Sequence, residues 1–256
     1  MAQKTRISWT ESSWSPWLGC TKVSSGCANC YASENMAIKL RRGGRVNWGP
    51  GQPRQRTKWT DPVALERKAI QEDRVITVFP SLCDVFDADG AQLATLDHWR
   101  DDLFDLIEST PHLAWLLLTK RPDVALQPHW AERIERLGRN VWIGVSIEDQ
   151  PNADRRVPQL LKIPAKNRFI SAEPLLGPID LTPWLHGLDW IIVGGESGKN
   201  ARPMQLEWAE AIRAACEKQE RTKFYFKQMG GRDKAKGGAL LAGRRIQQTP
   251  VFTAAA

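Results

Sequence analysis

The chain has 256 residues, and its 36 Lys and Arg against 29 Asp and Glu give a formal net charge of +7 at pH 7. A chain of this length can bury a sizeable core, and its composition (42% hydrophobic, 25% charged) excludes wholesale disorder. The longest uninterrupted apolar stretch, residues 113–118, is far shorter than the ~20 residues of a membrane span. Residues 1–9 hold no apolar signal core, so we expect a cytoplasmic protein.

Short apolar runs recur along the chain, and each ends in polar or turn-forming residues. The runs cover residues 76–79, 113–118, 141–145, 168–170, 190–193 and 223–226. They are rich in β-branched and aromatic residues and too continuous for strands exposed on one face, so they predict buried parallel strands. A short strand near residues 14–19 brings the expected total to about seven.

Helical patterns lie between these runs. Residues 93–108 and 207–219 each gather their apolar side chains on one side at helical spacing. Strands that alternate with helices indicate βαβ units and a parallel sheet. We therefore expect an α/β fold, a partial, open parallel β/α barrel of about six to seven βα units, with a doubly wound open sheet as the second choice.

Three of the five cysteines lie close together. Cys20, Cys27 and Cys30 are spaced C-x6-C-x2-C on a Gly- and Ser-rich loop that leads into a helix expected from about Tyr31. Such a loop can bring three thiolates to one centre, and sulfur ligands suit zinc or an iron–sulfur cluster. A closed zinc site needs a fourth ligand, for which Cys83 is a candidate, although it suits a core position equally. Three cysteines with one open position suit a cluster that binds a ligand at its fourth iron.

Polar residues follow the expected strands, and parallel strands direct such groups into one basin at their carboxyl ends. They are Cys20, Asp84, Thr119, Lys120, Ser146, Glu148, Glu173, Glu196 and Lys227. The glycines of the segment 194–198 either let backbone N–H groups approach a ligand or form a plain tight turn. Glu173 either faces the basin or forms a salt bridge with a neighbouring Lys or Arg.

The three-cysteine loop followed by βα repeats resembles the radical S-adenosylmethionine enzymes, whose usual spacing is C-x3-C-x2-C. Segments over nearly the whole chain are similar to a three-cysteine protein family frequent in bacteriophage and bacterial genomes. These segments are residues 14–32, 118–122, 140–148, 168–178, 189–198, 201–203 and 226–228. For a phage-encoded chain the expected location is the host cytoplasm.

The resemblance implies a [4Fe–4S] cluster on Cys20, Cys27 and Cys30, with S-adenosyl-L-methionine chelated by the fourth iron. Reductive cleavage of this cofactor would release a 5′-deoxyadenosyl radical, and the electron would come from a reductant such as flavodoxin or ferredoxin. The residues expected to bind the cofactor are Ser146, Glu148, Glu173, Gly194, Gly195, Glu196 and Ser197. The catalytic candidates are Glu173, Lys120 and Lys227.

The distribution of charge suggests the class of substrate. A single domain over residues 1–256 would carry a basic insertion at about 39–60 and a basic C-terminal extension at about 230–256, with a frayed end from 253. Cations interleaved with aromatic residues are typical of phosphate contact and base stacking, although a solvated loop explains them as simply. The expected nucleic-acid contacts are Arg41, Arg42, Arg45, Trp48, Arg54, Arg56 and Lys58.

These observations together favour a radical enzyme that modifies, rearranges or repairs a nucleobase in DNA or a nucleotide, after the base has left its stack. Two alternatives stay open. One is a zinc-stabilised nucleic-acid-binding module without catalysis. The other is a radical S-adenosylmethionine enzyme that acts on a peptide or small metabolite.

Overall fold

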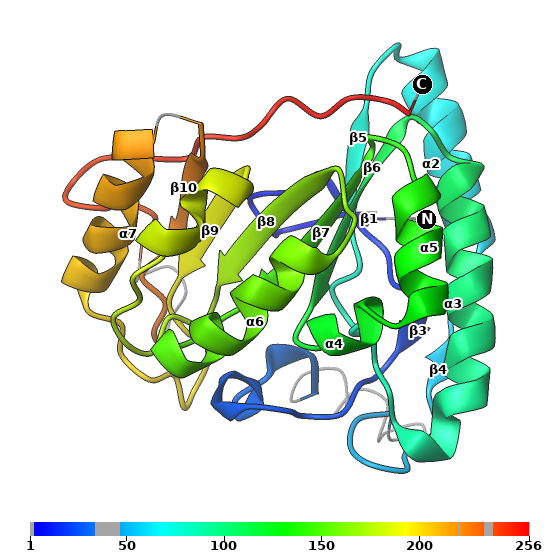
Figure 1. Ribbon diagram of the computed structural model, residues 1–256, viewed down its shortest axis with the longest axis horizontal. Coiled ribbons are helices and arrows are strands. Elements are labelled where there is room, and N and C mark those ends of the chain that lie inside the picture. The colour runs from blue at the N-terminus through cyan, green and yellow to red at the C-terminus, as the bar shows by residue number, and fades with distance from the viewer. Residues whose placement is uncertain (1–2, 34–46, 220, 233–237, 256) are drawn as a thin grey trace.

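The computed structural model describes residues 3–33, 47–219, 221–232 and 238–255, and their main sheet is a curled, open half-barrel with helices on its outer face (Figure 1). The strands follow the order β1-β2-β5-β6-β7-β8-β9-β10. All neighbours from β2 to β10 pair in parallel, whereas β1 pairs with β2 in the antiparallel sense. Their bounds are β1 (Gln3–Lys4), β2 (Ser12–Ser13), β5 (Ile76–Phe79), β6 (Leu113–Thr119), β7 (Val141–Ser146), β8 (Asn167–Ala172), β9 (Trp190–Gly194) and β10 (Lys223–Gln228).

Helices connect successive strands, as βαβ units require. The α-helices are α2 (Thr60–Gln71), α3 (Leu93–Glu108), α4 (Pro122–Ala125), α5 (Pro128–Arg136), α6 (Gln150–Lys162) and α7 (Leu206–Gln219). Short 3₁₀ helices are η1 (Ser25–Cys27), η3 (Gly90–Gln92) and η4 (Thr182–Gly187). None of the helices in the described part of the chain has the length and apolar character that crossing a membrane requires.

The expected partial barrel is confirmed, and the expected helix over residues 93–108 is α3. The strand expected near residues 14–19 is present as Trp17–Leu18, but it does not join the main sheet. The sheet takes Ser12–Ser13 as β2, and Trp17–Leu18 forms β3, which pairs instead with β4 (Gln55–Arg56). Pro16 lies between the two short strands, and because proline has no backbone N–H to donate, it interrupts the ladder there.

Both faces of the sheet are buried, which explains why the strands are continuous apolar runs. In β9, Ile191 and Val193 pack against the helices, whereas Trp190 and Ile192 point to the concave face. An aromatic cluster fills that concave face with Trp9, Phe79, Leu116, Trp142, Phe169, Trp190, Ile192 and Tyr225. The barrel interior is therefore packed around this cluster rather than left open as a channel.

The C-terminal segment crosses the edge of the sheet where the strands begin, and Figure 1 shows it in red along the top of the molecule. The indole nitrogen of Trp190 donates to the Gln248 carbonyl at 3.0 Å, and the Phe252 ring lies 5.4 Å from that of Trp142. The Ala255 amide donates to the Pro111 carbonyl at 2.9 Å. The chain is held in place as far as residue 255, so the expected fraying from residue 253 is wrong for the described residues.

Gly144 makes room for the aromatic cluster, because a Cβ there would lie 2.5 Å from the ring of Phe169. We expect Gly144→Ala to lower the free energy of unfolding by about 1–3 kcal/mol, the usual cost of overpacking a core. The control is Gly177→Ala, whose Cβ would have no atom within 4 Å. Urea unfolding of the two variants measures the effect, and equal midpoints would contradict the close packing.

Candidate metal centre

The cysteine loop, residues 20–30, lies at the edge toward which the parallel strands point, below the sheet in Figure 1. Its first residue follows Gly19, whose amide donates to the Leu82 carbonyl at 3.0 Å and which bridges to Cys83 just after β5. Gly19 has a φ of +105°, and a Cβ there would lie 1.8 Å from the Asn47 carbonyl oxygen. Only glycine fits this entry to the loop.

The donor set of the loop fits an iron–sulfur cluster in kind and number. Cys20, Cys27 and Cys30 are free, partly buried thiols on one short loop. Burial raises the pKa of Cys20, and the neighbouring charges of Asp84 and Cys30 raise it further. Within the described ranges, no three His, Cys, Asp or Glu side chains are gathered closely enough to hold one metal ion. Thiolates of a four-iron cluster each bind a different iron, so they need not converge on a point.

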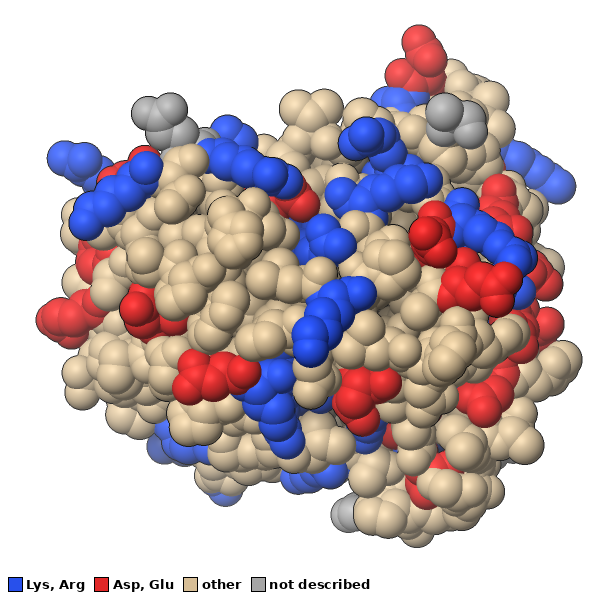
Figure 2. Space-filling model, viewed as in Figure 1, with Lys and Arg blue, Asp and Glu red and all other residues tan. Residues whose placement is uncertain are grey.

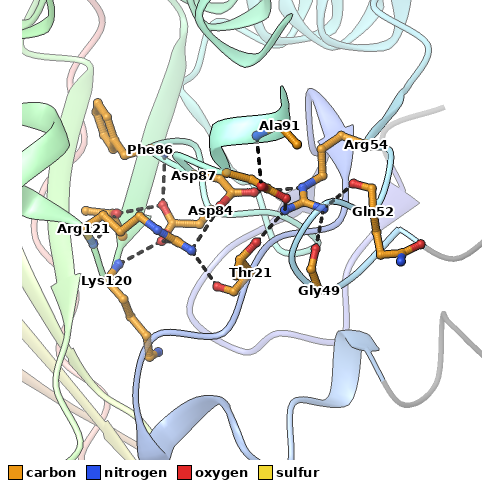
Figure 3. A network of polar contacts seen from close by, with 12 residues as sticks. Thr21, Gly49, Gln52, Arg54, Asp84, Phe86, Asp87, Ala91, Lys120 and Arg121 are labelled. Atoms are coloured by element: carbon orange, nitrogen blue, oxygen red, sulfur yellow. Dashed lines mark hydrogen bonds and ion pairs between the residues drawn. The ribbon is translucent and has the colours of Figure 1, made fainter. Parts of the chain in front are cut away.

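The start of the loop is held by a buried network of two arginines and three aspartates, Asp84, Asp87 and Asp89 (Figure 3). Arg121 Nη2 donates to the Thr21 carbonyl at 2.6 Å, and Arg54 Nη2 donates to the Thr21 hydroxyl at 2.7 Å. Arg121 forms ion pairs of 3.0 Å with both Asp84 and Asp87, and Arg54 pairs with Asp87 at 2.8 Å. The backbone next to Cys20 is thereby fixed to the end of β5.

The middle of the loop rests on Glu148, which follows β7 and has an exposed fraction of 0%. Its Oε1 accepts a hydrogen bond from the Gly26 amide at 3.2 Å, and its Oε2 accepts one from Arg156 Nη1 at 2.8 Å. A Cβ on Gly26 would lie 3.0 Å from the carboxylate carbon. The loop can approach Glu148 this closely because residue 26 is glycine.

The end of the loop is held by Glu196, which follows β9. Its carboxylate accepts hydrogen bonds from Asn29 Nδ2 at 2.9 Å and from Arg202 Nη2 at 2.6 Å, and Arg202 also donates to the Ser25 carbonyl at 2.9 Å. Burial alone would raise the pKa of Glu196, but the hydrogen bonds from Arg202 and Asn29 outweigh it and lower the pKa to about 2. Glu196 is therefore ionised when the protein is folded at neutral pH.

Three ion pairs thus contact the loop from the ends of β5, β7 and β9, and we call them the anchor pairs. They are Asp84–Arg121, Glu148–Arg156 and Glu196–Arg202. The sequence pattern identifies the three carboxylates as strand-end groups. It does not identify the arginines as their partners, because nothing in the local pattern shows which side chains meet after folding.

The residues expected to bind the cofactor are largely in contact with the protein itself. The Ser146 carbonyl accepts from Arg156 Nη1 at 2.8 Å, and the Gly195 amide donates to the Gln228 carbonyl at 2.9 Å. The Ser197 hydroxyl accepts from Gln228 Nε2 at 2.5 Å. A Cβ on Gly195 would lie 1.9 Å from the Met229 carbonyl oxygen, so this glycine permits close packing between the loops after β9 and β10. Cofactor contacts by these residues stay a prediction.

A carboxylate and an ammonium group meet beside the end of the cysteine loop. Glu173 after β8 forms an ion pair with Lys227 of β10, as the salt-bridge alternative for Glu173 predicts. Tyr31 is 44% exposed, and its hydroxyl donates to the Ser81 carbonyl at 3.0 Å. Burial raises the pKa of Tyr31, and the charges of Cys30 and Glu173 raise it further. Glu173, after the end of β8, and Lys227, within β10, thus contact each other.

The expected nucleic-acid segment is largely occupied by internal contacts where the structure describes it. Arg54 is buried in the network of Figure 3, so it presents no charge to a ligand at the surface. The guanidinium of Arg56 lies 4.4 Å from the centre of the Trp59 ring and pairs with an aspartate of α3. Lys58 is exposed and Trp48 is half-buried. Arg41, Arg42 and Arg45 lie outside the described residues.

The surface charge on the face shown in Figure 2 is mixed. Basic and acidic side chains are interspersed there, and acidic ones gather to the right of the view, over α3 and α5. Several acids of α3 pair with Arg133 of α5, among them Asp101 and Asp105. Among the described residues, this face therefore offers no extended basic patch to a nucleic acid.

The lowered pKa of Glu196 predicts an acid-sensitive contribution to stability. Its ordinary pKa is 4.5, so the stabilisation is complete above pH 4.5 and is lost as the pH falls from 4.5 to about 2. We expect the difference in free energy of unfolding between the natural chain and Glu196→Gln to shrink across this window. Urea unfolding at pH 2 to 5 measures it, with Glu135→Gln on the exposed face of α5 as the control. A difference that does not change with pH would contradict the contacts of Glu196.

The chain is similar in fold to one solved structure and in sequence to one protein family. A solved structure of a spore photoproduct lyase mutant matches with a TM-score of 0.51 and 13% sequence identity, which shows a shared fold alone. The match covers 87% of this chain and 64% of that chain, so this chain spans less than two thirds of that protein's length. No curated protein matches the chain. Residues 4–250 match the model of the family described as "Protein of unknown function (DUF5131)", and the chain belongs to this family.

Proposed function

We propose that this chain is a radical S-adenosyl-L-methionine enzyme that holds a [4Fe–4S] cluster on Cys20, Cys27 and Cys30. The observation that carries the proposal is the three-cysteine loop fixed at the strand-end edge of a partial parallel barrel. When bound, the cluster and S-adenosylmethionine together supply a 5′-deoxyadenosyl radical. A reductant such as flavodoxin or ferredoxin would deliver the electron.

The protein's own groups prepare the site in two ways. The anchor pairs fix the loop against the ends of β5, β7 and β9, so the thiols lie on a rigid support rather than on a free loop. The aromatic cluster fills the concave face of the sheet, so polar groups gather at the strand-end edge instead. Any ligand at the cysteines would therefore lie between the packed aromatic cluster and the polar groups of the strand-end edge.

We propose a nucleobase in DNA or in a nucleotide as the substrate. The Glu173–Lys227 pair offers a hydrogen-bond acceptor and a donor, which suits the edge of a base. Lys120, at the end of β6, forms no ion pair within the described residues, and its side chain extends away from the network in Figure 3. A cation in this position suits a phosphate group.

Metal analysis tests the proposed cluster. After oxygen-free purification we expect about four irons and matching sulfide per chain, with most of both lost in Cys27→Ala. The control is Cys216→Ala, which removes a thiol buried in α7 and keeps the iron. Iron, zinc and acid-labile sulfide are measured together. One zinc per chain without sulfide would contradict the radical enzyme and favour the zinc-stabilised binding module.

Nucleic-acid binding tests the proposed substrate. We expect Lys120→Ala to weaken binding of single-stranded DNA and to reduce the slope of log Kd against log salt by about one. The control is Lys68→Ala on α2, where the ammonium already pairs with Glu72. Release of 5′-deoxyadenosine under reducing conditions should rise when the DNA is added. Turnover that depends on a peptide and ignores nucleic acid would contradict the substrate class while leaving the radical chemistry standing.

A further inference from the structure

Each cysteine of the loop has a direct neighbour in the chain that one anchor pair holds. Thr21 follows Cys20, and its carbonyl accepts from Arg121 at 2.6 Å. Gly26 precedes Cys27, and its amide donates to Glu148 at 3.2 Å. Asn29 precedes Cys30, and its side-chain amide donates to the Glu196 carboxylate at 2.9 Å.

The carboxylates of the anchor pairs are buried and held on rigid elements. Asp84, Glu148 and Glu196 are exposed by 8%, 0% and 6%, and each follows a strand of the sheet. Asp84 is held in turn by the Thr119 hydroxyl at 2.7 Å and the Lys120 amide at 3.0 Å. Groups held in this way keep their positions whether or not a ligand is bound.

The loop has some order of its own, from the 3₁₀ helix η1 and from Lys22 Nζ, which donates to the Ala28 carbonyl at 2.8 Å. In η1 the Cys27 amide donates to the Ser24 carbonyl at 3.0 Å, and the Ala28 amide donates to the Ser25 carbonyl at 3.1 Å. The same Ser25 carbonyl accepts from Arg202, which also holds the Glu196 carboxylate through Nε and Nη2. Arg202 therefore joins the turn around Cys27 to the contact beside Cys30, and a guanidinium is the side chain that can span both.

We propose that the three anchor pairs are positioning units, one for each cysteine, and that they give the loop its ligand-holding shape before iron arrives. The inference rests on the proposed function for the identity of the ligand, but the shape of the loop is a property of the metal-free chain. Arg202 is the residue to test, because its side chain is 35% exposed whereas those of Arg121 and Arg156 are 10% and 1% exposed. Its replacement is therefore the least damaging to the fold.

Hydrogen exchange on the metal-free full-length chain tests the positioning role. We expect Arg202→Ala to speed exchange of the Cys27 and Ala28 amides at least about tenfold while the amides of β7 and β9 keep their rates, since only the loop is released. The control is Arg213→Ala, which removes an arginine of similar exposure that pairs with Glu210 and Glu217 on α7. Arg202→Lys should restore the rates only in part, because an ammonium cannot bridge two partners in the plane of a guanidinium.

The reconstituted protein supplies a second readout. The electron paramagnetic resonance spectrum of the reduced cluster should be broader in Arg202→Ala than in Arg213→Ala, because a loosened loop holds the cluster in several geometries. Loop exchange that is unchanged by Arg202→Ala would overturn the proposal. If that variant does not fold, Glu196→Gln, which keeps the shape of the side chain, gives the same comparison. The natural chain could show slow hydrogen exchange in the loop and still take up no iron. That result would support the positioning role of the anchor pairs and refute the proposed function.

Discussion

The contact between buried carboxylate–arginine pairs and the cysteine loop is the constraint on which the candidate site depends. Residues 20–30 contain glycine, serine and threonine but few large apolar side chains, so the loop cannot fix its shape by hydrophobic burial. Charge-assisted hydrogen bonds replace that burial, and they are about twice as strong as neutral ones. In the Asp84–Arg121 and Glu148–Arg156 pairs both charges are largely removed from water, so losing one partner would leave the other buried and unpaired.

The sheet makes these contacts possible. Parallel strands bring Asp84, Glu148 and Glu196 to one edge although they are distant in the sequence, and their strands are alternate members of the sheet. The opposite edge is covered by the C-terminal segment, and the concave face between the edges is filled by aromatic side chains. Chemistry-bearing residues are thus confined to the strand-end edge, as in other barrels of parallel strands.

The elements that follow from local pattern could be predicted from the sequence, and those that depend on distant partners could not. Strands β5 to β10 are continuous apolar runs because both faces of the sheet are buried, and the helix over Leu93–Glu108 has its apolar side chains at helical spacing. The carboxylates after the strands could be identified because parallel topology alone places them at one edge. Two other features could not be predicted, because their partners are distant in the chain. Trp17–Leu18 pairs with Gln55–Arg56, and the buried Arg54 pairs with Asp87 and Asp89.

The two ends of the described chain meet in the aromatic cluster, and this has a consequence for the order of folding. Trp9 lies 6.0 Å from Trp190, whose other side meets Phe252 at 5.9 Å. Trp9 and Phe252 are separated by nearly the whole described chain, so the concave face stays incomplete until both segments have packed against the strands between them. Contacts this distant in sequence form late in folding. Until both ends join the sheet, the half-barrel leaves indole and phenyl rings of its concave face exposed to water.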